Sequence, residues 1–165
     1  MDVGIFGILA ILSGAIFAWL GGRADSRFGP RPVILVCLIV LTLVAIGMVT
    51  VSRTSVFGLA VGAESRLPDI VFYVLGALIG AAGGALQSAS RTMMVGQADP
   101  ARMTEAFGLY ALSGKATSFI APLSIAAVTA LTGSQQLGIV PLIVLFVVGL
   151  ILLFWVKSDS EGLRA

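Results

Sequence analysis

One lysine, Lys115, lies deep inside an apolar stretch of the sequence, where its charge could bind a solute. Counted from a helix start near Thr104, it would lie roughly 16 Å along the helix axis, about mid-depth in a bilayer. An ammonium group at that depth costs about 2.5 to 3.5 kcal/mol on insertion scales, so a position facing lipid is disfavoured. Lys115 is therefore expected to face a water-filled cavity, to pair with a carboxylate, or to extend toward the aqueous edge.

Gln87 and Arg91 form a second polar pair with helical spacing. Residues four apart lie one turn apart, so both side chains would share a helix face. Arg91 is predicted to mark the cytoplasmic end of a membrane span. Gln87 lies deeper, where its amide needs a hydrogen-bond partner from the protein or from water.

The sequence lacks the residues that most enzymes and metal sites use. It contains no histidine and a single cysteine, Cys37, which is interpreted as a small core residue. No nucleophile and base pair, metal-ligand cluster or nucleotide-binding P-loop is recognisable. The Lys and Arg residues are scattered and the net charge is only +2, so the chain has no nucleic-acid footprint. We expect no catalytic residue, no metal, no cofactor and no nucleic-acid partner, which disfavours an intramembrane enzyme.

Composition makes the lipid bilayer the solvent for most of the chain. Its 165 residues are 58% hydrophobic and 11% charged, with a mean hydropathy of +1.08, whereas soluble domains carry about 25% charged residues. The apolar stretches reach the ~20 residues that a helix needs to cross a ~30 Å hydrocarbon core. We predict an all-α, polytopic membrane helical bundle of about five transmembrane helices, at about residues 4–22, 32–52, 69–89, 104–131 and 137–156.

The charges between these spans predict their orientation. Seven Lys and Arg residues fall in segments 23–31 and 90–103 and in the C-terminal tail, against two in the other connections. By the positive-inside rule, the N-terminus is outside and the C-terminus is cytoplasmic. Because Met1 lies almost directly against the first span on the external side, the chain is interpreted as a fragment, or a late start, of a longer protein.

Two spans carry features that bear on helix packing. Gly76, Gly80 and Gly84 recur every four residues, which gives the third span a nearly flat face. Such a face lets a neighbouring helix approach closely, either to pack statically or to slide. In the fourth span Pro122 removes one helix hydrogen bond, so a kink or local unwinding is expected there.

The segment GRADSRFGPR, residues 22–31, resembles the loop motif G-x-x-x-D-R-x-G-x-R of the major facilitator superfamily. The residues that match by spacing are Gly22, Arg27, Gly29 and Arg31. Ser26 takes the place of the motif aspartate, and Asp25 stands one residue early. In that superfamily the motif joins the second and third helices of each six-helix half, and its charges hold helix ends in one conformation.

Three further segments resemble one branch of that superfamily. GGALQSASR at 83–91, EAFGLYALSGK at 105–115, and LTGS with LGI within 131–139 are similar to the vacuolar-effluxer-like (autophagy-related) permeases, which have bacterial members. The similarity covers essentially the whole chain and implies helices eight to twelve of a twelve-helix transporter. Helix seven and the N-terminal half of the same transporter would then be partners absent from this chain.

The resemblance implies a secondary active permease that moves a small solute by alternating access, in a bacterial cytoplasmic (inner) membrane. The candidates for its cavity wall are Lys115, Gln87, Tyr110 and Ser113. An anionic or zwitterionic solute, such as an amino acid, would suit Lys115. A non-transporting membrane-packing module, or a truncated and inactive fragment, remains the alternative.

Overall fold

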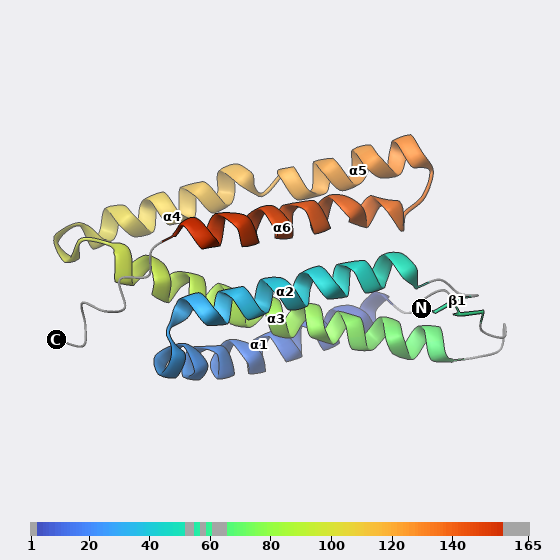
Figure 1. The fold of residues 1–165 in the computed structure, drawn as a ribbon, viewed down its shortest axis with the longest axis horizontal. Helices are drawn as coiled ribbons and strands as arrows, with labels where there is room; N and C mark the ends of the chain where they lie inside the picture. The colour runs from blue at the N-terminus through green and yellow to red at the C-terminus, as the bar shows by residue number, and fades with distance from the viewer. Residues whose placement is uncertain (1–2, 52–54, 57–58, 61–65, 157–165) are drawn as a thin grey trace.

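A computed structural model describes residues 3–51, 55–56, 59–60 and 66–156 of the chain. Its α-helices are α1 (Val3–Phe28), α2 (Pro30–Thr50), α3 (Leu67–Gln97), α4 (Met103–Thr117), α5 (Ile120–Thr132) and α6 (Val140–Trp155). Short 3-10 helices, η1 (Pro100–Arg102) and η2 (Leu137–Ile139), precede α4 and α6. Between α2 and α3, β1 (Ser55–Val56) pairs antiparallel with β2 (Leu59–Ala60). Figure 1 shows the helices lying along one common direction.

Five helical stretches in these ranges are long and apolar enough to cross a bilayer. They are Gly4–Phe28, Pro30–Thr50, Leu67–Gln97, Pro100–Thr132 and Leu137–Trp155. Many of their large apolar side chains, including Ile11, Leu112 and Phe154, are exposed on the surface of the bundle, as hydrocarbon around the helices requires. The predicted all-α, multi-pass membrane bundle with five spans is confirmed.

Helices α1 and α3 continue beyond the apolar stretches that predicted them. α1 ends at Phe28 instead of near residue 22, and α3 ends at Gln97 instead of near residue 89. Gly29 ends α1 because its φ of 85° lies in the left-handed region that favours glycine, and Pro100 prevents α3 from continuing. Hydropathy therefore predicted the apolar part of each helix but not the residue at which the helix ends.

The fourth span is interrupted, as Pro122 predicts. α4 ends at Thr117 and α5 begins at Ile120, and the break is visible in Figure 1. Pro122 has no N–H to donate to the carbonyl of Ser118, which it would bond in a continuous helix. The hydrogen bond that would continue the helix at Ser118 is therefore missing, and the next helix, α5, begins at Ile120.

Helices α1 and α3 run side by side and approach each other at glycine residues. A Cβ atom added to Gly80 would overlap the carbonyl oxygen of Ala10, and one added to Gly84 would overlap that of Gly14. Gly76 lies against the ring of Phe6. The small-residue face of α3 is therefore turned toward α1.

A hydrogen bond crosses the same contact. The Ser13 hydroxyl donates to the backbone carbonyl of Ala77 at 2.8 Å. The bond requires the two backbones to lie close together, which the neighbouring glycines allow.

The described buried residues lie mainly between α2 and α3, and α6 packs against this contact through Phe146 and Leu153. Three clusters follow one another along this contact: Ile34, Leu38, Ala89 and Leu153; then Cys37, Leu41, Ala82 and Ala85; then Val44, Val51 and Leu75. In contrast, α4 and α5 contribute no buried residue. The fourth span thus lies at the edge of the described bundle.

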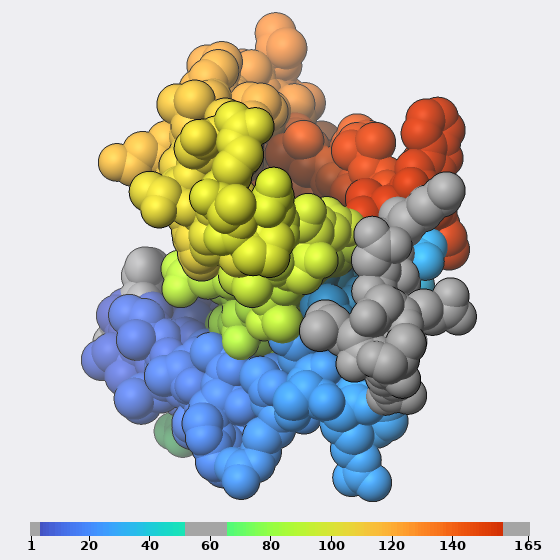
Figure 2. Space-filling model, turned by 90° about the vertical axis from the view of Figure 1, so that its left-hand side faces the viewer, coloured from blue at the N-terminus to red at the C-terminus, as the bar shows by residue number. Residues whose placement is uncertain are grey.

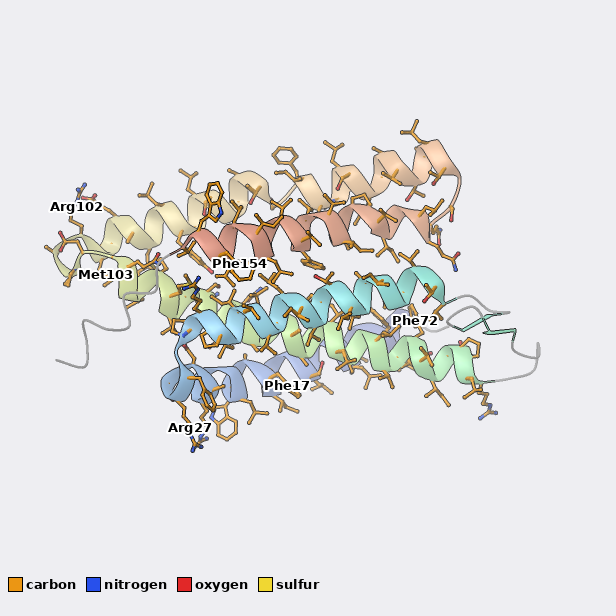
Figure 3. All side chains as sticks on the ribbon, viewed as in Figure 1. Phe17, Arg27, Phe72, Arg102, Met103 and Phe154 are labelled. Atoms are coloured by element: carbon orange, nitrogen blue, oxygen red, sulfur yellow. The ribbon has the colours of Figure 1, made fainter. Side chains whose placement is uncertain are left out.

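Two of the connections predicted to be cytoplasmic lie at the same end of the bundle. Figure 2 views this end, where the α1–α2 turn, the α3–α4 connection and the last turns of α6 come together. Arg27 and Arg102, labelled in Figure 3, both lie there. Three of the residues in the charge count, Arg53, Lys157 and Arg164, fall outside the described residues.

The glycine contact predicts a position-specific loss of stability. Gly84→Ala should lower the free energy of unfolding by about 1 to 3 kcal/mol, because the added methyl group must push α1 away from α3. Thermal unfolding in detergent, followed by circular dichroism, measures this change.

Gly83→Ala is the matched control, since a Cβ at Gly83 would meet no atom within 4 Å. It should be neutral or stabilise the helix by up to about 1 kcal/mol, because alanine is the better helix former. Equal losses for the two variants would show that α1 does not contact this face of α3.

Candidate functional site

Three of the four predicted cavity residues line one pocket between α3 and α4. Tyr110, Ser113 and Lys115 from α4 lie around it together with Arg91 from α3. The pocket has a volume of about 590 Å³, enough for a small solute. Lys115 lies close to the middle of its 33-residue helical stretch.

Gln87, the fourth candidate, lines a neighbouring pocket between α1 and α3. This pocket has a volume of about 720 Å³, and its polar side chains are Gln87, Ser88, Arg91 and Thr92. Gly14 and Gly84 form part of its wall, so the glycine contact between α1 and α3 also shapes it. The two pockets share Arg91.

Arg91 has a different position from the one expected from the sequence. It was expected at the end of its span, but α3 continues to Gln97, so Arg91 lies inside the helix. Met93 and Met94 follow it and prolong the helix, since methionine is a good helix former. Its spacing from Gln87, one turn earlier on the same face, was the signal that could have placed it in the cavity wall.

Tyr110 ties α4 to α3. Its hydroxyl and that of Ser90 are 2.8 Å apart and form a hydrogen bond in which either group can donate. The Ser90 hydroxyl also lies 3.1 Å from the backbone carbonyl of Gln87. Tyr110 is thus held at its hydroxyl while its ring lines the pocket, so it fixes the position of Ser113 and Lys115 relative to α3.

The charges in the pocket are of one sign. Among the described residues, neither Lys115 nor Arg91 forms an ion pair, and the Arg102–Glu105 pair lies outside both pockets. No acidic residue lines either pocket. Two cations without a counter-charge give the pocket a positive potential, which attracts anionic groups.

The break between α4 and α5 lies next to Lys115. The Lys115 carbonyl accepts hydrogen bonds from the Ser118 backbone N–H at 3.3 Å and from its hydroxyl at 2.8 Å. Pro122 cannot satisfy the Ser118 carbonyl, as a helix would otherwise do. Such interruptions at mid-depth are tolerated where the backbone lines a cavity or is buried in protein.

The loop motif folds as the end of α1 and the turn into α2. Asp25 is 5% exposed, and its Oδ1 atom has no hydrogen-bond partner among the described residues. Ser26, which stands at the motif position of the aspartate, is exposed and donates its hydroxyl to the Arg23 carbonyl at 2.8 Å. The inward-facing acidic residue is therefore Asp25, despite its place one residue early.

The remaining motif residues connect the helices of this turn. The Gly29 N–H donates to the Asp25 carbonyl at 2.8 Å, and Arg31 donates to the Phe154 carbonyl at the end of α6 at 3.3 Å. Gly22 lies against α3, where an added Cβ would come 3.5 Å from the Ser88 hydroxyl. The motif thus ties together the ends of α1, α2 and α6.

Within the described part of the chain, no group of three or more His, Cys, Asp or Glu side chains is placed to hold a metal ion.

The hydrogen bond between Ser90 and Tyr110 predicts an energetic coupling. Tyr110→Phe and Ser90→Ala should each destabilise the protein, and the double variant should lose about 0.5 to 1.5 kcal/mol less than the sum. Chemical unfolding in detergent measures all three variants. The control combines Tyr110→Phe with Thr92→Ala. The Thr92 hydroxyl donates to the Ser88 carbonyl within α3, so the losses in unfolding free energy from these two changes should be additive. Additivity for Ser90 and Tyr110 as well would rule out the bond.

Comparison with known proteins identifies the family. The family model described as "Vacuole effluxer Atg22 like" matches residues 1–163. The chain is also 25% identical over 147 residues to the uncharacterized MFS-type transporter YxiO of Bacillus subtilis (strain 168). That alignment covers 89% of this chain but only 31% of the Bacillus protein. No solved structure matches the chain. The resemblance seen in the sequence is confirmed, and the chain belongs to the vacuole effluxer Atg22-like family of membrane proteins.

Proposed function

We propose that this chain forms the C-terminal transmembrane part of a secondary active permease that moves a small solute bearing an anionic group. Family membership supports a role in transport in general. The observation that carries the finer proposal is the pocket that Arg91 and Lys115 share. Neither cation has an ion-pair partner among the described residues, so both can bind a solute anion.

The cost of the Lys115 charge inside a membrane span supports a functional role. Insertion scales assign about 2.5 to 3.5 kcal/mol to one Lys or Arg at the centre of a span. Water in the pocket offsets this cost in the empty state, and the anionic group of a solute offsets it in the loaded state. A small carboxylate fits this chemistry, and so does an amino acid whose ammonium group faces Phe107 or Tyr110 of the same pocket.

Transport by alternating access needs a second body against which these helices move. We propose that this body is the N-terminal half of the same transporter, with the present helices as numbers eight to twelve. The chain spans 31% of the length of its Bacillus relative, which agrees with a part of a larger protein. Because α4 and α5 contribute no buried residue, they leave surface for such contacts.

Two features of the sequence support a proposed energy source and a proposed orientation. No P-loop sequence occurs in these 165 residues, so this part supplies no ATP-binding site, and an ion or solute gradient is the proposed driving force. We place the end that carries Arg27, Arg31 and Arg102 in the cytoplasm of a bacterial cell, by the positive-inside rule.

Substitution of the pocket cations tests the proposal in the longer transporter that contains this chain. Lys115→Ala and Arg91→Gln should each lower solute uptake by roughly 10- to 100-fold, the loss expected for one hydrogen bond to a charged group. Uptake of a labelled amino acid and of a labelled small carboxylate into vesicles measures the effect, with expression checked in parallel.

Arg102→Gln is the matched control, because Arg102 is exposed and pairs with Glu105 outside the pocket. Its uptake should equal that of the unmodified protein. Unchanged uptake in Lys115→Ala would remove Lys115 from the site. A transporter that moves no tested solute in any form would favour the non-transporting packing module.

A further inference from the structure

An apolar groove separates α1 from α2 on the outer face of the bundle, near the α1–α2 turn. Its volume is about 420 Å³. Phe17, Leu20 and Phe28 of α1 and Val33, Val36 and Cys37 of α2 line it. Phe17, Leu20, Phe28 and Val36 are exposed, so the groove opens onto the surface of the described bundle.

The length of the groove matches one half of a bilayer. The eleven residue-to-residue steps from Phe17 to Phe28 rise roughly 16 Å along the helix axis. A single leaflet contributes about half of the ~30 Å hydrocarbon core. A lipid acyl chain lying along the groove would therefore reach from the helix turn to the middle of the membrane.

Arginine residues stand at the end of the groove where a lipid headgroup would lie. The guanidinium carbon of Arg27 is 5.8 Å from the centre of the Phe28 ring, which lines the groove. Arg23 stands over Trp19 at 4.3 Å on the flank of the same helix. Figure 3 shows Arg27 at the outer edge of this turn and Phe17 farther along α1.

Helices α1 and α2 carry no exposed acidic side chain beside these cations. Asp25 is the only acidic residue between positions 3 and 51, and it is buried. Both Arg23 and Arg27 are exposed. The headgroup end of the groove is therefore cationic, and the groove itself is apolar.

We propose that this groove binds an anionic phospholipid, with one acyl chain along Phe17, Val36 and Phe28 and the phosphate at Arg27 and Arg23. Apolar contacts do not select this lipid, because bulk acyl chains are equally apolar. Selectivity comes from the arginines, each of which strengthens binding of an anionic lipid by about fivefold near the membrane surface. The site is distinct from the pocket of Arg91 and Lys115.

Photolabelling tests the proposal with the purified protein in phosphatidylcholine vesicles. Phosphatidylglycerol or phosphatidylcholine carrying a photoreactive group on one acyl chain is added, and labelled peptides are identified by mass spectrometry. Phosphatidylglycerol should label residues 17–37 at least about fivefold more strongly than phosphatidylcholine does. Arg27→Gln should lower this labelling by about fivefold, and Arg66→Gln, which removes an exposed arginine before α3, should leave it unchanged.

A second pair of variants tests the acyl chain. Val36→Phe should fill the groove and reduce labelling there, whereas Leu43→Phe, on the exposed part of α2 beyond the groove, should not. Equal labelling by the two lipids overturns the proposal, as does labelling no stronger than at Val148 on the exposed face of α6. If neither lipid labels the groove, no acyl chain lies in it, and this result also overturns the proposal.

Discussion

The contact between the backbones of α1 and α3 is the constraint on which the rest of the structure depends. In lipid, helices gain little from hiding apolar side chains, so close packing and hydrogen bonds must hold them together. Gly14, Gly80 and Gly84 allow that approach, and the Ser13 hydroxyl bonds across it. The same contact sets the wall of the pocket that holds Gln87 and Arg91, so the packing of the bundle and the geometry of the candidate site have one origin.

From this contact the site is built outward in two steps. Tyr110 bonds to Ser90 and fixes α4 against α3, which brings Lys115 to the pocket that Arg91 lines. The break before Pro122 then frees the backbone beside Lys115 from a continuous helix. A lysine near the middle of a span and an interrupted helix beside it are costly in a membrane. Their cost is offset if they line a path for a charged solute, which is the activity we propose.

Much of this could be predicted from the sequence, because membrane insertion leaves a strong signal in composition. The five spans, the break near Pro122 and the family all follow from local patterns. What could not be predicted depends on contacts between distant segments or on hydrogen bonds outside the lipid layer. Arg91 is an example: hydropathy placed it at a helix end, while the structure places it between two pockets. The inward position of Asp25 likewise depends on how the end of α1 packs.

The most direct test of this account asks whether water reaches the pockets beside Arg91. In a Cys37→Ser background, which removes the single native cysteine, Gln87→Cys, Ser113→Cys and Val148→Cys are reacted in vesicles with a charged thiol reagent. The account predicts that cysteines at the two pocket positions react and that the one on the exposed apolar face of α6 does not. If the two pocket positions are as unreactive as the α6 position, the pockets are not part of an aqueous path, and the proposed site is contradicted.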